Sequence, residues 1–336
     1  MKSLVASIFV ALSVVLLGLS NAPACANDVI ILRFSHVVAP DTPKGRGAEK
    51  FKELAALYSR GRVKVEVYPH AQLYRDQEEL EALQLGAVEM VAPSLAKFGP
   101  LGAKEFEVFD LPYLFPNWAA LHAVTQGPIG KELLVSLEGK GIRGLAFWDN
   151  GFKIMSANRP IQTPRDLAGL RMRIQPSRVL QAQMSALGAV PQVIPLPEVH
   201  QALQMGVIDG TENPPSNMLV QRLSEVQPFA TLSNHGYLGY AVIVNKAFWD
   251  GLTRDIRASL ERAMAEATTY TNTIAETANA EALSRMRAAG TTIFHEQTLQ
   301  EREEWIAAMA PVYADVAARI GKNRIDTIRA ATGMTQ

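Results

Sequence analysis

Residues 166–174 read DLAGLRMRI, a short stretch with the pattern of a half-buried strand that carries two arginines. Successive side chains of a strand point to opposite faces, so Met172 shares one face with its apolar neighbours at 170 and 174. Arg171 and Arg173 share the other face. Because guanidinium groups need polar or anionic partners when they leave water, we expect a partner opposite these arginines.

Strand and helix patterns alternate before this stretch, which predicts an α/β fold with helices packed against sheets. Thr42 and Pro43 open a predicted helix over 44–59, because proline is favoured at the start of a helix. Asp76 and Glu79 have the spacing of a capping box at the start of a helix over 76–86. Predicted strands in this half of the chain cover residues 29–39, 62–69 and 141–148.

The same alternation resumes after Asn150. An alanine-rich helical pattern over 253–289 exceeds the average helix length of roughly 10–14 residues, so we expect this helix to pack across more than one body of the molecule. Chain length favours two domains, but no linker marks a boundary between them. Further predicted elements are helices over 163–169, 178–188 and 198–206, strands over 170–174, 189–195, 207–213, 239–245 and 291–295, and an amphipathic stretch from 300 onward.

The N-terminus has the pattern of a secretory signal peptide, residues 1–26. Lys2 precedes an apolar run that ends near residue 19, and Ala24, Cys25 and Ala26 form a small-residue cleavage site. A transmembrane anchor is disfavoured because the run is shorter than the roughly 20 residues that span a bilayer. Acylation of Cys25 is the weaker alternative, because Pro23 and its neighbour make a poor approach to the cysteine. We therefore expect export, cleavage after Ala26 and a soluble mature protein.

Cleavage restricts the chemistry of the mature chain. Removing 26 of the 336 residues leaves 310, none of which is cysteine, so disulfides, thiolate nucleophiles and cysteine metal sites are excluded. The loss of Lys2 leaves 32 basic and 33 acidic residues, a formal charge of −1. A chain with this balance does not hold nucleic acid or an anionic membrane by bulk electrostatics.

No catalytic motif is visible. GRGAEK at 45–50 has two glycines of a dinucleotide fingerprint but Lys50 where the third belongs, and GPIGKE lacks the upstream glycine and the hydroxyl residue of a phosphate loop. Neither G-x-S-x-G nor H-E-x-x-H occurs, and the six histidines are scattered. We expect no cofactor, no metal ion and no enzymatic activity.

Polar and basic residues do gather where strands are predicted to end. These are Lys153, Arg173 and Asn213. Ligands of α/β proteins commonly bind beyond the carboxyl ends of strands, so these three residues mark a candidate binding site.

Four segments together resemble the periplasmic solute-binding proteins of TRAP transporters, which deliver organic acids to a sodium-coupled membrane permease. They are QLYRDQEELEALQLGAVEMVAPSLAKF, LAGLRMRI, EVHQALQMGVIDGTENPPSN and LGYAVIVNK, in this order. The resemblance covers essentially the whole mature chain. ENPPSN and HGYLGYAVIVNK resemble the C4-dicarboxylate branch more than the sialic-acid branch.

The resemblance implies the periplasmic binding-protein fold, with two α/β domains, a ligand cleft between them, crossover strands and one long domain-spanning helix. Because the chain passes between the domains, each domain is discontinuous. We expect residues 27–150 and 239–278 to form one domain, and 151–238 and 279–336 to form the other.

The resemblance also implies ligand contacts. Arg173 matches the arginine that clamps a ligand carboxylate, for which a rigid guanidinium fork is better suited than a lysine. Asn213 matches the asparagine of the family's ENP turn, and Lys153 stands where the family often has a second basic residue. Further candidates are His36 after the first strand, Arg75 for a distal carboxylate, Ser94 as a hydroxyl donor, and Trp148 and Tyr237 as cleft walls.

The resemblance implies a monomeric periplasmic receptor that closes two domains over a small organic acid and delivers it to the membrane subunits of a TRAP permease. The ligand shifts the open and closed populations by its higher affinity for the closed form. Succinate, malate and fumarate are the leading candidates, and aromatic, keto and other acids remain open. Two alternatives remain: a sensor that presents its ligand-bound form to a membrane kinase, and a periplasmic enzyme with the same cleft.

Overall fold

The computed structural model describes residues 29–333. The predicted signal peptide lies outside the described residues. Within residues 29–333, no helix combines the length and the apolar character needed to cross a membrane.

One nine-stranded mixed sheet runs through the whole molecule, in the order β2-β1-β3-β8-β4-β7-β5-β6, with β9 paired to β8. We call the part built on β1, β2 and β3 the first lobe and the part built on β5, β6 and β7 the second lobe. Within each lobe these strands are parallel, as expected for an α/β protein. The strands are β1 (Ile30–Ser35), β2 (Val63–Tyr68), β3 (Met90–Val91), β5 (Arg171–Ile174), β6 (Val190–Val193), β7 (Gly210–Asn213) and β9 (Ile293–His295).

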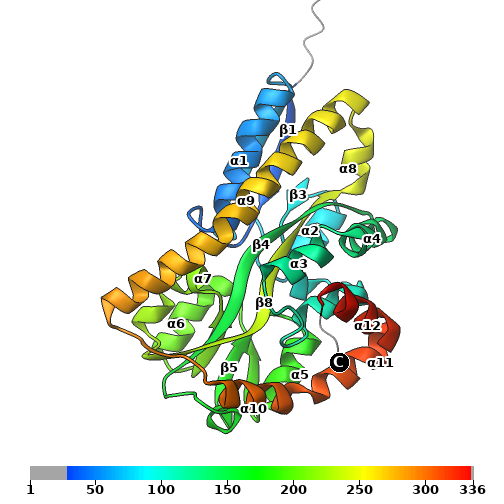
Figure 1. The fold of residues 1–336 in the computed structure, drawn as a ribbon. Coiled ribbons are helices and arrows are strands. Elements are labelled where there is room, and N and C mark those ends of the chain that lie inside the picture. Colours follow the sequence, from blue (N-terminus) through cyan, green and yellow to red (C-terminus); the bar gives the residue numbers. More distant parts are fainter. Residues whose placement is uncertain (1–28, 334–336) are drawn as a thin grey trace, which may run out of the picture.

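Two long antiparallel strands, β4 (Ile142–Ala157) and β8 (Phe229–Asn245), connect the lobes (Figure 1). Most residues of both strands are buried. Their register shifts at three places, between Gly144 and Ala146, Asp149 and Gly151, and Lys153 and Met155, and such irregularities bend and twist a strand pair. These are the crossover strands of the predicted fold. Our sequence prediction covered only their outer parts, 141–148 and 239–245.

Helix α9 (Arg254–Ala289, 36 residues) runs along the molecule and contacts α1 (Pro43–Tyr58) in the first lobe, β4 in the middle and α7 (Pro215–Val220) in the second lobe (Figure 1). This confirms the predicted long helix. Helices α1 and α9 approach closely at Gly47, where an added Cβ would lie 2.1 Å from Oγ1 of Thr271. A larger residue at position 47 would therefore force the Thr271 side chain or one of the two helices to move.

Helix α1 begins as predicted, because Oγ1 of Thr42 accepts a hydrogen bond from the Gly45 amide at 3.1 Å and Pro43 occupies the first helical position. Helix α9 ends at Gly290, which adopts the left-handed conformation with φ of 70°. The remaining helices before α9 are α2 (Glu79–Gln84), α3 (Trp118–Thr125), α4 (Pro128–Ser136), α5 (Arg178–Ala186), α6 (Val199–Gln204), α7 (Pro215–Val220) and α8 (Lys246–Gly251), with α1 at Pro43–Tyr58.

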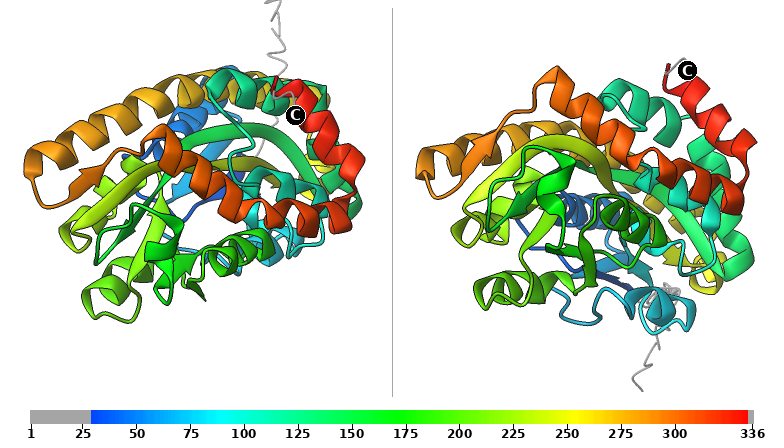
Figure 2. Two further views of the ribbon diagram at one scale, coloured as in Figure 1. Left: turned by 60° about the horizontal axis from the view of Figure 1, so that its bottom comes forward. Right: turned by 90° about the horizontal axis from the view of Figure 1, so that it is seen from below.

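The C-terminal amphipathic stretch forms three helices, α10 (Leu299–Met309), α11 (Pro311–Ile320) and α12 (Lys322–Ala331), which follow one another along one side of the molecule (Figure 2). Helices α11 and α12 pack on the segment that contains α3, and their apolar side chains share a core with Phe106 and Leu121. That segment belongs to the predicted first domain, whereas α11 and α12 were assigned to the second. The domain boundaries remain a prediction.

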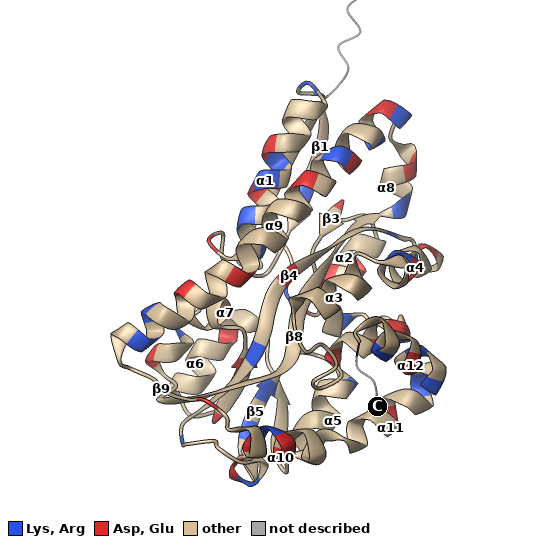
Figure 3. Ribbon diagram, viewed as in Figure 1, with Lys and Arg blue, Asp and Glu red and all other residues tan. Residues whose placement is uncertain are grey.

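Acidic and basic residues are interspersed along the outer helices α1 and α9 in the view of Figure 3. Exposed pairs such as Lys50 with Glu53 and Arg262 with Glu266 join neighbouring turns of these helices. This distribution agrees with the formal charge balance of the chain.

Candidate functional site

A small, largely enclosed cavity lies between the two lobes, beside the crossover strands. Its volume of about 10 Å³ corresponds to about one water molecule, so an organic solute enters only if the lining groups or the lobes move apart. The first lobe contributes Val37, Val38, Lys44, Asp76, Ser94 and Lys97, the second lobe contributes Arg173, Gln175, Leu196, Asn213 and Asn217, and β8 contributes Leu238 and Tyr240.

Arg173 is the basic group of the second lobe in this cavity. Its side chain is 2% exposed, and its Nε donates a hydrogen bond to the backbone carbonyl of Ile194 at 2.9 Å. Burial lowers the pKa of Arg173, against the opposing effects of Asp76 and Glu212. Within residues 29–333 no carboxylate forms an ion pair with Arg173.

The two arginines of β5 have different partners. Arg171 is 44% exposed in its side chain and forms a two-pronged ion pair with Asp209, with an Nη2 to Oδ1 distance of 2.8 Å. Arg173 lies two residues further along the same face, at the end of the strand that borders the cavity. The partner that we expected opposite the arginines is Asp209 in the case of Arg171. Arg173 instead faces the cavity between the lobes.

Ser94 and Asn213 both line the cavity with polar atoms that lack hydrogen-bond partners. Within the described residues, Oγ of Ser94 and Nδ2 of Asn213 make no hydrogen bond, although the residues are 3% and 1% exposed. Leaving a buried polar atom unpaired costs about 1–3 kcal/mol. These two atoms are therefore available to a polar guest in the cavity.

Lys97 lines the cavity from the first lobe and was not among the predicted site residues. Its Nζ contacts carboxylate oxygens of both Asp76 and Glu79. Burial opposes its charge, but the two carboxylates outweigh burial and raise the pKa of Lys97. Burial likewise opposes ionisation of Asp76, yet Lys97 and Arg173 lower the pKa of Asp76 below its usual range.

The capping box predicted for Asp76 and Glu79 is wrong. Helix α2 has Glu78 at its N-cap position without a side-chain cap hydrogen bond. Asp76 and Glu79 instead turn inward to Lys97, because a buried ammonium requires anionic partners. Asp76 also accepts a hydrogen bond at 2.8 Å from the amide of Leu196, which joins the first lobe to the second.

Lys44 was also missed by the sequence analysis. It is fully buried on α1, its Nζ donates to the carbonyl of Ala92 at 2.9 Å, and it lies 3.8 Å from the centre of the Tyr240 ring. Burial is the main reason that the pKa of Lys44 is lowered to about 7; Glu79 opposes this shift and Lys97 adds to it. One feature of the sequence could have indicated Lys44 as a site residue. It lies two residues after the helix-capping Thr42, where the first βα connection ends.

His36 is fully buried beside the cavity but does not line it. Both ring nitrogens lack hydrogen-bond partners among the described residues, and the ring meets Phe34 edge-on at 6.3 Å between centroids. Burial and the nearby Lys44 lower the pKa of His36 to about 3, so the ring is neutral at pH 7.

Three predicted site residues, Trp148, Lys153 and Tyr237, belong to the crossover strands, and their polar atoms bind other residues of the protein. Lys153 donates to Glu212 at 2.7 Å, and His235 contacts the other oxygen of that carboxylate at 2.8 Å. Trp148 and Tyr237 are core residues. Nε1 of Trp148 donates a hydrogen bond to Thr268, and the hydroxyl of Tyr237 donates one to Asp149. None of the three lines the cavity, and on β8 Tyr237 alternates with Leu238 and Tyr240, which do line it.

Arg75 lies at the surface, outside the cavity lining. Its side chain is 65% exposed and its Nη1 lies 3.2 Å from Oε1 of Glu198. Because Arg75 precedes α2 in the first lobe and Glu198 precedes α6 in the second, this ion pair bridges the two lobes.

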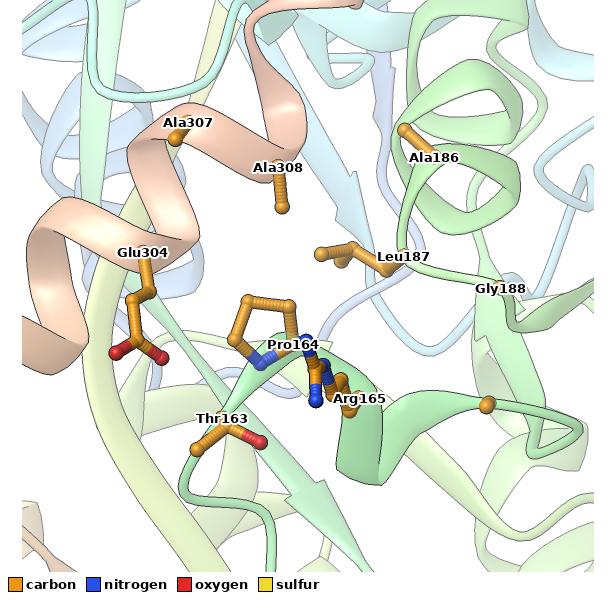
Figure 4. A pocket seen from close by; sticks show the side chains of 10 residues that line it. Thr163, Pro164, Arg165, Ala186, Leu187, Gly188, Glu304, Ala307 and Ala308 are labelled. Carbon is orange, nitrogen blue, oxygen red and sulfur yellow. The ribbon is translucent and has the colours of Figure 1, made fainter.

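A larger and more open hollow of about 830 Å³ lies elsewhere, between α10 and the end of α5 (Figure 4). Apolar side chains such as Ala186, Leu187 and Ala308 form most of its lining. Its two charged groups, Arg165 and Glu304, are exposed. It therefore lacks the buried cations of the cavity between the lobes.

Within residues 29–333, no group of three His, Cys, Asp or Glu side chains is arranged to hold a metal ion.

Two α/β lobes, paired crossover strands and a cation-lined cavity between the lobes define a two-domain binding protein for a small polar solute. Residues 34–320 match the family model of the bacterial extracellular solute-binding proteins, family 7 (DctP), and the chain belongs to this family. The predicted fold and the resemblance to TRAP solute-binding proteins are confirmed. The family is one of solute-binding proteins and not of enzymes.

The chain is similar to characterised members along nearly its full length. It is 64% identical over 312 residues to the C4-dicarboxylate-binding periplasmic protein DctP of Rhodobacter capsulatus, covering 93% of both chains. A TRAP periplasmic solute-binding protein of Sulfurospirillum deleyianum with bound succinate matches with a TM-score of 0.87 and 40% identity, over 90% of this chain and 99% of that one. A TRAP periplasmic solute-binding protein of Pseudomonas aeruginosa with bound L-malate matches with a TM-score of 0.83 and 43% identity, over 85% of this chain and 99% of that one.

Proposed function

We propose that this protein is the periplasmic solute-binding protein of a TRAP transporter and captures a C4-dicarboxylate such as succinate, malate or fumarate. The observation that carries the proposal is the buried Arg173, which lines a cavity between two lobes and has no carboxylate partner within residues 29–333. A buried cation of this kind is stabilised by an anionic ligand. The relatives named above bind C4-dicarboxylates, which supports this ligand class.

In the proposed complex Arg173 binds one ligand carboxylate through its guanidinium fork. The amide Nδ2 of Asn213 and the hydroxyl of Ser94 donate further hydrogen bonds, because these atoms are buried without partners in the described chain. Arg173 and Asn213 belong to the second lobe and Ser94 belongs to the first. A ligand that contacts all three favours the closed arrangement over an open one by its differential affinity.

Contacts between the lobes hold the closed arrangement. The Asp76 side chain accepts a hydrogen bond from the Leu196 amide, and Arg75 pairs with Glu198 at the surface. The first of these contacts is buried and the second is exposed, so most of the stabilisation comes from the first. We infer that opening breaks both and admits the ligand.

The ligand class is tested by isothermal titration calorimetry of the mature protein, beginning at residue 27. The panel contains succinate, malate and fumarate, with a monocarboxylate series and sialic acid as comparison ligands. We expect saturable binding of at least one C4-dicarboxylate at much lower concentration than any comparison ligand. Failure of all three diacids to bind folded protein would overturn the assignment.

Closure is tested by small-angle X-ray scattering with and without the tightest ligand. We expect the radius of gyration to fall on binding, because the two lobes move together. A scattering profile that does not change with saturating ligand would contradict the closure mechanism while leaving the ligand assignment intact.

The proposal includes export by residues 1–26, function as a monomer and delivery of the ligand to the membrane subunits of a TRAP permease. Uptake of labelled succinate into cells that express the permease should require this protein in the periplasm. The bound acid should be recovered unchanged after prolonged incubation, since a binding protein returns its ligand. Chemical conversion of the acid would instead favour an enzyme.

A further inference from the structure

The cavity contains two buried cations without a carboxylate partner, one from each lobe. Lys44 of the first lobe and Arg173 of the second both line it, and both are at most 2% exposed. Within residues 29–333 each donates to a backbone carbonyl, of Ala92 and of Ile194 respectively, and neither forms an ion pair with an acidic side chain.

Lys97, the third cation of the lining, differs from these two. It contacts Asp76 and Glu79, so its charge is already neutralised by the protein. A second ligand carboxylate therefore gains little from Lys97, because the resident carboxylates repel it. Lys44 offers an ammonium group with three donors, for which the described residues supply one carbonyl and the face of the Tyr240 ring.

We propose that Lys44 binds the second carboxylate of the ligand and thereby makes the cavity select dicarboxylates over monocarboxylates. This proposal rests on the proposed function, in which Arg173 binds the first carboxylate. Two separated cations from opposite lobes match a dianion, whereas a monocarboxylate satisfies only one of them. The ligand's two charged ends then connect α1 of the first lobe to β5 of the second.

The charged and titratable groups around Lys44 are arranged to make its charge responsive to the ligand. From the other elements it is influenced by Glu79 on α2, Lys97 after β3, Asp76 before α2, His36 after β1 and the Tyr240 ring on β8. Glu79 and Asp76 favour the charged form, but burial and Lys97 outweigh them. A second ligand carboxylate adds one further anion to this set and stabilises the ammonium form.

The test compares succinate with succinamate, which has nearly the same shape but carries a neutral amide in place of one carboxylate. Dissociation constants are measured by calorimetry at pH 7 for the wild type and for Lys44→Met. We expect the wild type to prefer succinate strongly, and Lys44→Met to reduce the succinate-to-succinamate preference by at least about thirtyfold, with a smaller effect on succinamate alone.

Lys52→Met is the matched control, because Lys52 lies on the same helix with its side chain 47% exposed. It should leave the preference unchanged. Thermal unfolding and circular dichroism establish that the variants are folded, and Lys44→Gln replaces Lys44→Met if the latter is not. A preference that is unchanged in folded Lys44 variants would overturn the proposal, as would an equal loss of affinity for both ligands. Failure of the wild type to bind succinate would instead overturn the proposed function.

Discussion

Replacing Arg173 by lysine is the sharpest test of the binding site, because it keeps the positive charge and changes only the geometry. Lysine has no Nε to donate to the Ile194 carbonyl, which Arg173 reaches at 2.9 Å. It also offers a carboxylate a single ammonium in place of two parallel N–H groups. The substitution therefore leaves one buried carbonyl unpaired and distorts the ligand contact.

The expected loss of binding free energy is large because Arg173 is buried. Arg173 is 2% exposed, so water cannot replace the lost contacts. A hydrogen bond to a charged group contributes about 1.5–3 kcal/mol, and disturbing a buried charge pair costs about 2–5 kcal/mol. We therefore expect the dissociation constant for succinate to rise by about 30- to 5,000-fold.

Calorimetry with succinate at 25 °C measures this effect, and Arg171→Lys is the control. Arg171 lies on the same strand and face, but its side chain is 44% exposed and paired with Asp209, so its replacement should change the ligand affinity by less than about 1 kcal/mol. A folded Arg173→Lys protein that binds succinate within threefold of the wild type would refute the reasoning. Equal losses in both variants would refute it too, because they would indicate a general effect on the strand.

Three further outcomes are expected. The pKa of Lys44 is about 7 in the free protein and rises beside a ligand carboxylate, so binding takes up protons above pH 7 and succinate affinity should fall as the pH is raised; calorimetry in buffers of different ionisation enthalpy measures the uptake. The pKa of His36 falls from 6.5 to about 3 on folding, so the unfolded state binds more protons between these values. Urea unfolding should therefore show that His36→Gln removes about 2–3 kcal/mol of the stability lost between pH 6.5 and 4.5. Arg75→Ala breaks an exposed pair with Glu198 and should change succinate affinity by less than about fivefold, whereas a loss above a hundredfold would place Arg75 at the ligand.

The candidate site was predictable where a side chain's position follows from its strand. Arg173 and Asn213 lie at the ends of β5 and β7, and these strands end at the cavity. Lys153 was predicted by the same rule, but its strand continues for four more residues and pairs with both β7 and β8. Lys153 lies outside the cavity lining and pairs with Glu212, because a strand buried on both sides can carry a lysine inward where a carboxylate meets it. Contact between Lys153 and a ligand remains a prediction.

The buried charges of the first lobe were not predictable from local patterns. Asp76 and Glu79 have the spacing of a helix cap, and in an isolated helix that use would satisfy free amides. Lys97 lies 18 residues after Glu79 and competes for the same carboxylates once the chain is folded. Desolvation decides the competition, because an unpaired buried ammonium costs more than an uncapped helix end that water can reach.

By itself the amino-acid sequence determined the alternation of strands and helices, the long helix after Thr253, the shared face of Arg171 and Arg173, and the family resemblance. These properties depend on residues close together in the chain, through side-chain periodicity, helix caps and turn residues. Only the tertiary structure decided that Arg171 meets Asp209 at the surface, that Arg173 and Lys44 are buried without carboxylate partners among residues 29–333, and that Lys97 is neutralised. The physical reason is that burial and long-range pairing determine the free energy of a charge, and both arise when distant segments of the chain come together.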